Sequence, residues 1–103
     1  AIAWDQAEQR VGQQATVQGP VVGTHFAEES RGQPTFLNIG NPFPDPNRLT
    51  VVIWIEDRAA FPEPPETAYD GKTVCVTGVI ETYEGVPEIV AASPSVIAIV
   101  EAR

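Results

Sequence analysis

Residues 69–89 of the chain read Tyr-Asp-Gly-Lys-Thr-Val-Cys-Val-Thr-Gly-Val-Ile-Glu-Thr-Tyr-Glu-Gly-Val-Pro-Glu-Ile. After Gly71, valines alternate with small or polar residues, which is the period-two pattern of a β-strand with one buried face. The pattern predicts a strand from Thr73 to Tyr83, a tight turn at Glu84-Gly85 and a return strand from Val86 to Ala91. This stretch therefore predicts a β-hairpin.

The other apolar segments are also short, because ten prolines and eight glycines divide the chain. Strands are predicted, in chain order, at Ala15–Phe26, Thr35–Ile39 and Leu49–Ile55, with a last apolar stretch at Val96–Val100. Gly19 and Pro20 interrupt the first of them, so we expect a long strand that bends at Gly19. Residues 40–47 contain three prolines, which lack the amide needed for strand pairing, and are named the proline loop.

Two short helices are expected outside these strands. Asp5 is placed to cap a helical turn that ends at Gly12. Glu56-Asp57 can start a second helix that runs through Phe61 and ends at Pro62. The second helix lies between the third and fourth predicted strands.

The composition fits one folded domain. The chain has 103 residues, of which 43% are hydrophobic and 19% charged, which is too apolar for a disordered chain. No apolar run approaches the roughly 20 residues that cross a bilayer, so no membrane span is predicted. The single cysteine, Cys75, excludes an internal disulfide and a zinc site built from several cysteines.

The charge is strongly acidic. Fourteen Asp and Glu residues against six Lys and Arg residues give a formal net charge of −8. The basic residues are scattered along the sequence, and Lys72 is the only lysine. This counts against tight charge-driven binding of a phosphate backbone, because counterion release requires clustered cations.

The elements come in the order of a small OB-fold barrel. The stretch Tyr69–Ile89 resembles the fourth and fifth strands of OB-fold nucleic-acid-binding-like domains. There, a glycine-lysine step opens a strand of valines, a second glycine bends it (here Gly78), and tyrosine-x-glycine-x-proline-x-isoleucine forms the hairpin. Val11-Gly12 and Val17-Gln18-Gly19 resemble the first strand. This resemblance, to the anticodon-binding and single-strand-binding OB superfamily, implies that residues 1–103 form one all-β domain: a five-stranded OB-fold barrel with a short N-terminal helix and a short helix between strands 3 and 4.

Strand alternation separates an inner from an outer face. In the third predicted strand, four side chains share the face expected to line the interior: Leu49, Val51, Ile53 and Ile55. In the second strand Leu37 and Ile39 are expected to point inward, which leaves Phe36 and Asn38 outside. Trp54 is expected on the same outer side.

OB-folds bind oligonucleotides and oligosaccharides over their second and third strands, and an exposed aromatic ring there stacks on a base with about 1–3 kcal/mol. In the anticodon-binding branch a phenylalanine of the second strand stacks on a base, and Phe36 in Thr-Phe-Leu-Asn resembles it. Arg31 and Arg48 lie in the loops on either side of that strand and are placed to add positive charge. The candidate ligand-binding residues are Phe36, Asn38, Trp54, Arg31 and Arg48. The alternative is that Phe36 and Trp54 pack beneath the proline loop or the end helix.

No pattern typical of a catalytic or metal site is found in the sequence. Asp45, Arg48, Asp57 and Arg58 are loosely comparable to the acids and arginines of OB-fold nucleases, but they do not match that pattern. His25, the only histidine, has no cysteine or second histidine nearby. We therefore expect a non-enzymatic domain without a metal or cofactor.

Two functions remain open from the sequence. One is a binding module for single-stranded nucleic acid, favoured by the resemblance and by Phe36 and Trp54. The other is an acidic protein-interaction or accessory OB domain of a secreted or envelope protein that does not bind nucleic acid, favoured by the charge of −8. The compartment of the protein also stays open.

Overall fold

The computed structural model of the protein describes residues 1–100. The strands are β1 (Ile2–Ala3), β2 (Gln14–Phe26), β3 (Thr35–Ile39), β4 (Leu49–Ile53), β5 (Thr73–Val79), β6 (Glu81–Tyr83), β7 (Val86–Val90) and β8 (Ile97–Val100). The helices are the 3-10 helices η1 (Trp4–Arg10) and η2 (Pro94–Val96) and the α-helices α1 (Ile55–Arg58) and α2 (Pro65–Ala68). A mostly β domain with short helices is therefore confirmed.

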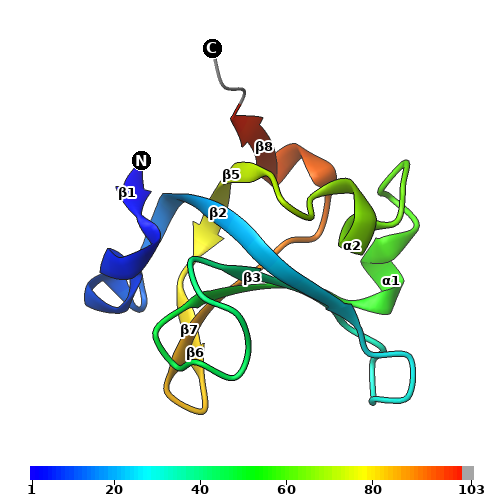
Figure 1. Ribbon diagram of the computed structural model, residues 1–103, viewed down its shortest axis with the longest axis horizontal. Coiled ribbons are helices and arrows are strands. Elements are labelled where there is room, and N and C mark those ends of the chain that lie inside the picture. The colour runs from blue at the N-terminus through cyan, green and yellow to red at the C-terminus, as the bar shows by residue number, and fades with distance from the viewer. Residues whose placement is uncertain (101–103) are drawn as a thin grey trace.

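All strands belong to one mixed sheet (Figure 1). The strand order is β6-β7-β4-β3-β2-β5-β8, and β1 is added to β2 in parallel. β2 pairs with β5 through residues 14–20 and with β3 through residues 21–26. β4 and β7 pair in parallel. β2 is thus shared by the two halves of the sheet.

Gly19 allows two other elements to pack closely on β2. A Cβ atom added to Gly19 would lie 2.5 Å from Cγ2 of Ile39 and 2.7 Å from Cδ1 of Trp4, so no larger residue fits without movement. The register with β3 shifts between Val21 and Gly23. The pairing of β2 with β5 stays regular through Gly19, and the one irregularity of β2 in its pairing with β3 is the shift after Val21, so the bend at Gly19 stays a prediction.

The core consists of inward-facing side chains from the strands. Fully buried members are Val17, Leu37, Ile39, Leu49, Val51, Ile53, Val74, Val76 and Ile89. These include the inner residues predicted on the second and third strands, with one exception. Ile55 is 39% exposed, because β4 ends at Ile53 and Trp54 becomes the N-cap of α1. The interior position predicted for Ile55 is wrong.

The helices also differ from the prediction in detail. η1 is capped by Ala3 without a side-chain hydrogen bond, so Asp5 lies in its first turn and is not its cap. The predicted stop at Gly12 is confirmed by its φ of +89°. Two helices stand where one was expected after β4: α1 begins at Ile55, and Pro65 occupies the first turn of α2, where its missing amide costs nothing.

The predicted strand from Thr73 to Tyr83 is broken at Ile80. The Ile80 amide donates to the carbonyl of Gln13 at 2.9 Å, and its carbonyl accepts from the amide of Gly12 at 2.7 Å. Ile80 therefore pairs with the turn after η1, and the chain changes direction between β5 and β6.

Within residues 1–100, no helix is long and apolar enough to cross a membrane.

We predict that Gly78→Val destabilises the domain, because a Cβ atom at this position would lie 2.7 Å from Cγ2 of buried Ile89. Overpacking of this kind costs about 1–3 kcal/mol. The matched control is Thr82→Val on exposed β6, for which we expect a change within about 0.5 kcal/mol. Urea unfolding compares the two variants, and equal midpoints would contradict the close contact.

Candidate functional site

One side of the sheet carries two rows of side chains that run across the strands, because paired residues on neighbouring strands face the same side. The aromatic row consists of His25, Phe36, Val52 and Val90, on β2, β3, β4 and β7. The polar row consists of Gly23, Asn38, Thr50, Glu88 and Glu81, on β2, β3, β4, β7 and β6. We call this side the outer face, and it contains Phe36 and Asn38 as predicted.

The centre of the outer face is more buried than the sequence suggested. Asn38 is 6% exposed, Thr50 7% and Val52 2%, while Phe36 is half-buried. β4 is therefore buried on both sides, which alternation alone does not reveal. The parts of the two rows that remain accessible lie around this centre, at His25, Phe36, Glu88, Val90 and Glu81.

Trp54 lies at the edge of the outer face. It follows β4 in an extended conformation and caps α1 through its carbonyl, which accepts from the amides of Asp57 and Arg58 at 3.0 and 3.1 Å. Its ring packs on Gly32 of the β2–β3 loop (residues 27–34), where a Cβ atom would lie 2.9 Å from Cε3. The side chain keeps 37% of its surface exposed. Trp54 therefore packs on one loop and still presents part of its ring to solvent.

Arg31 and Arg48 do not converge on one spot. Their loops leave opposite ends of β3 (Figure 1), and the five residues of β3 correspond to roughly 17 Å. Arg31 is exposed, and no hydrogen bond or ion pair within residues 1–100 involves its side chain. The two arginines therefore bracket Phe36 rather than forming a basic patch.

Arg48 is held by three neighbours. Its Nε donates to Oδ1 of Asn38 at 3.2 Å, an Nη atom donates to the carbonyl of Asp45 at 2.6 Å, and its guanidinium lies 5.1 Å from the ring centroid of Phe43. Arg48 is therefore tied both to β3 and to the proline loop. It places positive charge at the Asn38 end of the polar row.

Arg58 is bound within the scaffold. It donates to both carboxylate oxygens of Glu66 at 2.8 and 2.9 Å and to Oγ1 of Thr35 at 2.8 Å, and its guanidinium lies 3.8 Å from the Phe26 ring centroid. The hydrogen bond from Arg58 lowers the pKa of Glu66 despite partial burial. Arg58 therefore joins α1, α2 and the β2–β3 hairpin, and pairs with Glu66 rather than with Asp57.

The other end of the polar row is acidic. Glu88 lies directly opposite Glu81 on β6 and beside Thr50 on β4. Burial, followed by the charge of Glu81, raises the pKa of Glu88. The Oγ1 atom of Thr50 is buried and has no hydrogen-bond partner among residues 1–100. The polar row thus begins at the side-chain amide of Asn38, which Arg48 binds, and ends at the carboxylates of Glu88 and Glu81. The unpaired hydroxyl of Thr50 lies between them.

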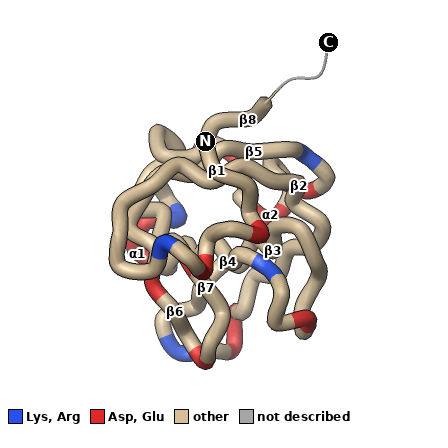
Figure 2. The backbone as a smooth tube through the Cα atoms, turned by 90° about the vertical axis from the view of Figure 1, so that its left-hand side faces the viewer, with Lys and Arg blue, Asp and Glu red and all other residues tan. Residues whose placement is uncertain are grey.

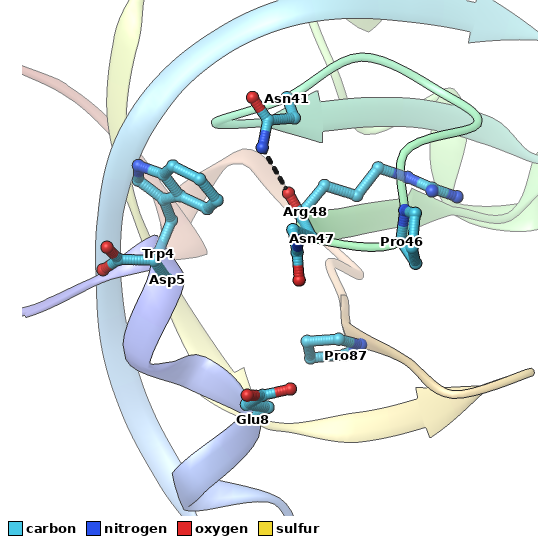
Figure 3. A pocket seen from close by; sticks show the side chains of 8 residues that line it. All are labelled: Trp4, Asp5, Glu8, Asn41, Pro46, Asn47, Arg48 and Pro87. Atoms are coloured by element: carbon cyan, nitrogen blue, oxygen red, sulfur yellow. Dashed lines mark hydrogen bonds between the residues drawn. The ribbon is translucent and has the colours of Figure 1, made fainter.

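A cleft of about 300 Å³ lies between η1, the proline loop and β7 (Figure 3). It is lined by Trp4, Asp5, Glu8, Asn41, Pro46, Asn47, Arg48 and Pro87. The Asn41 side chain donates to the Asn47 carbonyl at 2.7 Å, while the Arg48 guanidinium points away from the cleft. Asp5 and Glu8 give the cleft acidic character, which disfavours a phosphate there.

Charge is dispersed over the remaining surface. The basic residues lie apart from one another along the backbone (Figure 2). Within residues 1–100, no three His, Cys, Asp or Glu residues cluster closely enough to hold a metal ion. The outer face therefore combines aromatic and neutral polar groups with two carboxylates, and one arginine lies beside each end of β3.

The structure is similar in fold to parts of two aminoacyl-tRNA synthetases. An asparaginyl-tRNA synthetase from Pyrococcus horikoshii, complexed with asparaginyl-adenylate, matches 92% of this chain with a TM-score of 0.56 and 16% identity. The aspartyl-tRNA synthetase from Entamoeba histolytica matches 88% with a TM-score of 0.55 and 13% identity. The chain has an OB-like fold. It spans about one fifth of each synthetase, 20% and 19% of their lengths.

The sequence matches no protein-family model and no curated protein. The OB-fold resemblance inferred from the sequence motifs is nevertheless confirmed by these structural matches. At 13–16% identity, the matches establish the fold of the chain and leave its ligand to be proposed.

Sequence reasoning missed Thr50 and Glu88 as members of the same row as Asn38. Alternation places each of them outward on its own strand. It does not show that β4 pairs with β7 in parallel, with Thr50 opposite Glu88. The pairing of distant strands is what brings the three side chains together.

We predict that Glu88→Gln stabilises the domain at neutral pH by about 0.5 kcal/mol, a small value because solvent screens a partly exposed group. The pKa of Glu88 is raised in the folded state. Its contribution to stability is therefore fully present below the unfolded-state pKa of about 4.3 and is lost as the pH rises through the folded-state pKa. The gain from Glu88→Gln should accordingly vanish near about pH 3.5.

Urea unfolding of the parent protein and of Glu88→Gln, at neutral pH and at about pH 3.5, tests this prediction. The control is Glu63→Gln, which removes the same charge from an exposed position between α1 and α2. An equal gain at both pH values, or the same gain from the control, would show that the environment of Glu88 is not the cause.

Proposed function

We propose that the protein is a non-enzymatic binding module for single-stranded nucleic acid and that the outer face is its binding surface. The observation that carries the proposal is the position of Phe36, which lies in the middle strand of the aromatic row of an OB-like sheet. The sequence around it resembles the anticodon-binding branch of OB domains, and the fold is similar to parts of two tRNA synthetases. A half-buried ring is fixed in position and still offers a surface for base stacking.

The proposed mode of binding is stacking with local polar contacts. A base stacks on Phe36, and the neighbouring base reaches the exposed part of Trp54. Arg31 and Arg48, beside the two ends of β3, neutralise flanking phosphates. With few cations available, the affinity is expected to be modest and to need both the stacking and the two arginines.

We also propose that the sheet closes into the five-stranded barrel expected from the sequence. β5 and β6 are separated by Ile80 alone, and they stand at distant points of the sheet order. β5 pairs with β2, and β6 pairs with β7. One bent strand therefore links both sides of the path, which supports closure through β5 and β6.

The second candidate is an acidic protein-interaction or accessory domain, as in a secreted or envelope protein. The observations that favour it are the net charge of −8 and the acidic cleft between η1 and the proline loop. An overall negative field opposes a polyanion and favours a basic partner. The two candidates differ in whether an oligonucleotide binds at all.

We predict that a fluorescein-labelled oligouridylate binds the protein at low salt and that Phe36→Leu weakens this binding by about fivefold to a hundredfold. The leucine keeps an apolar side chain but removes the stacking ring, which contributes about 1–3 kcal/mol per base. Fluorescence anisotropy measures the affinity. The matched control is Tyr83→Leu, which removes an aromatic ring that is 67% exposed on β6. Equal effects of the two changes would locate the contact away from Phe36.

Trp54 provides an independent signal. Base stacking quenches indole emission, so adding the unlabelled oligouridylate should reduce the emission of the parent protein. Trp54→Phe should bind without this quenching, since the remaining tryptophan, Trp4, packs against Gly19 and Gly40. Quenching that persists in Trp54→Phe would assign the signal to Trp4 instead.

We predict that Arg31→Ala combined with Arg48→Ala abolishes measurable oligouridylate binding at physiological salt. Arg31→Ala alone should leave the melting temperature nearly unchanged, because its side chain is exposed. Arg48→Ala should lower the melting temperature, because it frees Asn38 and removes the contact with the proline loop. Thermal unfolding and anisotropy of the single and double variants separate the two effects. A double variant that binds like the parent would place the phosphate contacts elsewhere.

A further inference from the structure

The acidic end of the polar row lies within the proposed binding surface. Glu88 is two residues before Val90 and in direct register with Thr50, so it stands next to the aromatic row. Its cross-strand neighbour on β6 is Glu81. Like charges directly opposite each other destabilise an antiparallel pair. The outer face thus brings two carboxylates together beside the aromatic row.

In the described part of the chain, residues 1–100, the elements packed around β7 supply no direct cationic partner for Glu88. β4 presents Thr50, and the ionisable group of β5, Cys75, faces Gln18. η1 carries Asp5, Glu8 and Arg10, of which the two acids line the cleft with Pro87.

The proline loop adds Asp45, and Arg48 follows it. Arg48 is directed to Asn38 and to the Asp45 carbonyl. Within residues 1–100, no salt bridge involves Glu88. Glu88 therefore meets Glu81 as its nearest charged neighbour on the outer face.

The hydroxyl group of Thr50, which lies beside Glu88, also lacks a hydrogen-bond partner within residues 1–100. Its Oγ1 is buried without a hydrogen bond, and the residue is only 7% exposed. A buried hydroxyl of this kind is costly unless a partner is supplied. The Oγ1 atom has almost no exposed surface, so a ligand on the face meets Glu88, the ionisable group beside it.

We propose that binding of single-stranded nucleic acid to the outer face is coupled to the uptake of one proton by Glu88, so that pH controls the affinity. This inference rests on the proposed function. A phosphate placed near Glu88 disfavours its ionised form, and by linkage protonation of Glu88 favours the phosphate to the same extent. Burial and Glu81 already raise the pKa of Glu88 in the free protein, which brings the protonation closer to neutral pH.

The protonated carboxyl also changes the chemistry of the row. An ionised carboxylate only accepts hydrogen bonds, whereas a protonated carboxyl has one O–H group that donates. The proton comes from solvent and remains on Glu88 in the complex, so no other group changes its charge. The face then offers a donor at Glu88 to the oxygens of a base or phosphate.

The test measures oligouridylate affinity by anisotropy at about pH 5.5 and about pH 7.5, at one fixed ionic strength. His25 lies in the aromatic row, so each protein is measured with its native His25 and again with His25→Gln, which removes the only imidazole of the chain. Glu88→Gln is compared with Glu63→Gln, which removes the same charge from outside the face. Circular dichroism and unfolding at both pH values establish that the variants are folded.

The protein with His25→Gln alone should bind about fivefold more tightly at the lower pH. Adding Glu88→Gln should reproduce the higher affinity at about pH 7.5 and reduce the pH dependence to less than about twofold. Adding Glu63→Gln should leave the pH dependence unchanged.

Binding that is independent of pH, or a gain from Glu63→Gln as large as that from Glu88→Gln, overturns the inference and leaves the proposed function standing. A loss of binding in Glu88→Gln also overturns the inference, because such a loss would mean that the complex requires the ionised carboxylate. Absence of binding by every folded protein at both pH values overturns the proposed function itself and the inference with it.

Discussion

The structure depends on the continuity of β2 across both halves of the sheet. Its first seven residues pair with β5 and its last six with β3, so this one strand fixes the positions of β3 and β5 relative to each other. The crossing is possible because Gly19 has no side chain where Trp4 and Ile39 pack. Trp4 also covers Gly40, whose φ of +90° favours glycine, so the same indole holds η1 against the start of the proline loop.

Local sequence patterns predicted most of the elements but not their junctions. Thr35–Ile39 was predicted with its observed bounds, because its alternation is regular and a loop precedes it. The end of β4 was misplaced, because Trp54 and Ile55 are as apolar as the strand before them and only the cap geometry separates strand from helix. The break at Ile80 was also missed, because it results from backbone hydrogen bonds to the turn after η1. Junctions made by distant parts of the chain leave no local signal.

The candidate site was predictable only as individual outward residues. Alternation placed Phe36 and Asn38 on the outer face, and the structure confirms this placement. It did not predict that Thr50 and Val52 are buried on that face, because the burial of a strand's second side depends on parts of the chain that are distant in sequence. Nor did it predict that Arg48 is fixed by Asn38, since that contact depends on the register in which β3 pairs with β4. The roles of Phe36, Trp54 and the two arginines in binding remain predictions.

The net charge does not by itself decide between the two candidate functions. At physiological ionic strength, charges more than about 8 Å apart in solvent are largely screened, so a ligand on the outer face responds mainly to nearby groups. Those groups are Arg48 at one end of the polar row and Glu88 with Glu81 at the other. The local balance is therefore set by two carboxylates and one arginine, and neutralising one carboxylate leaves the row without net charge. An acidic domain can thus present a surface that accepts a polyanion, provided that the proton on Glu88 accompanies the ligand.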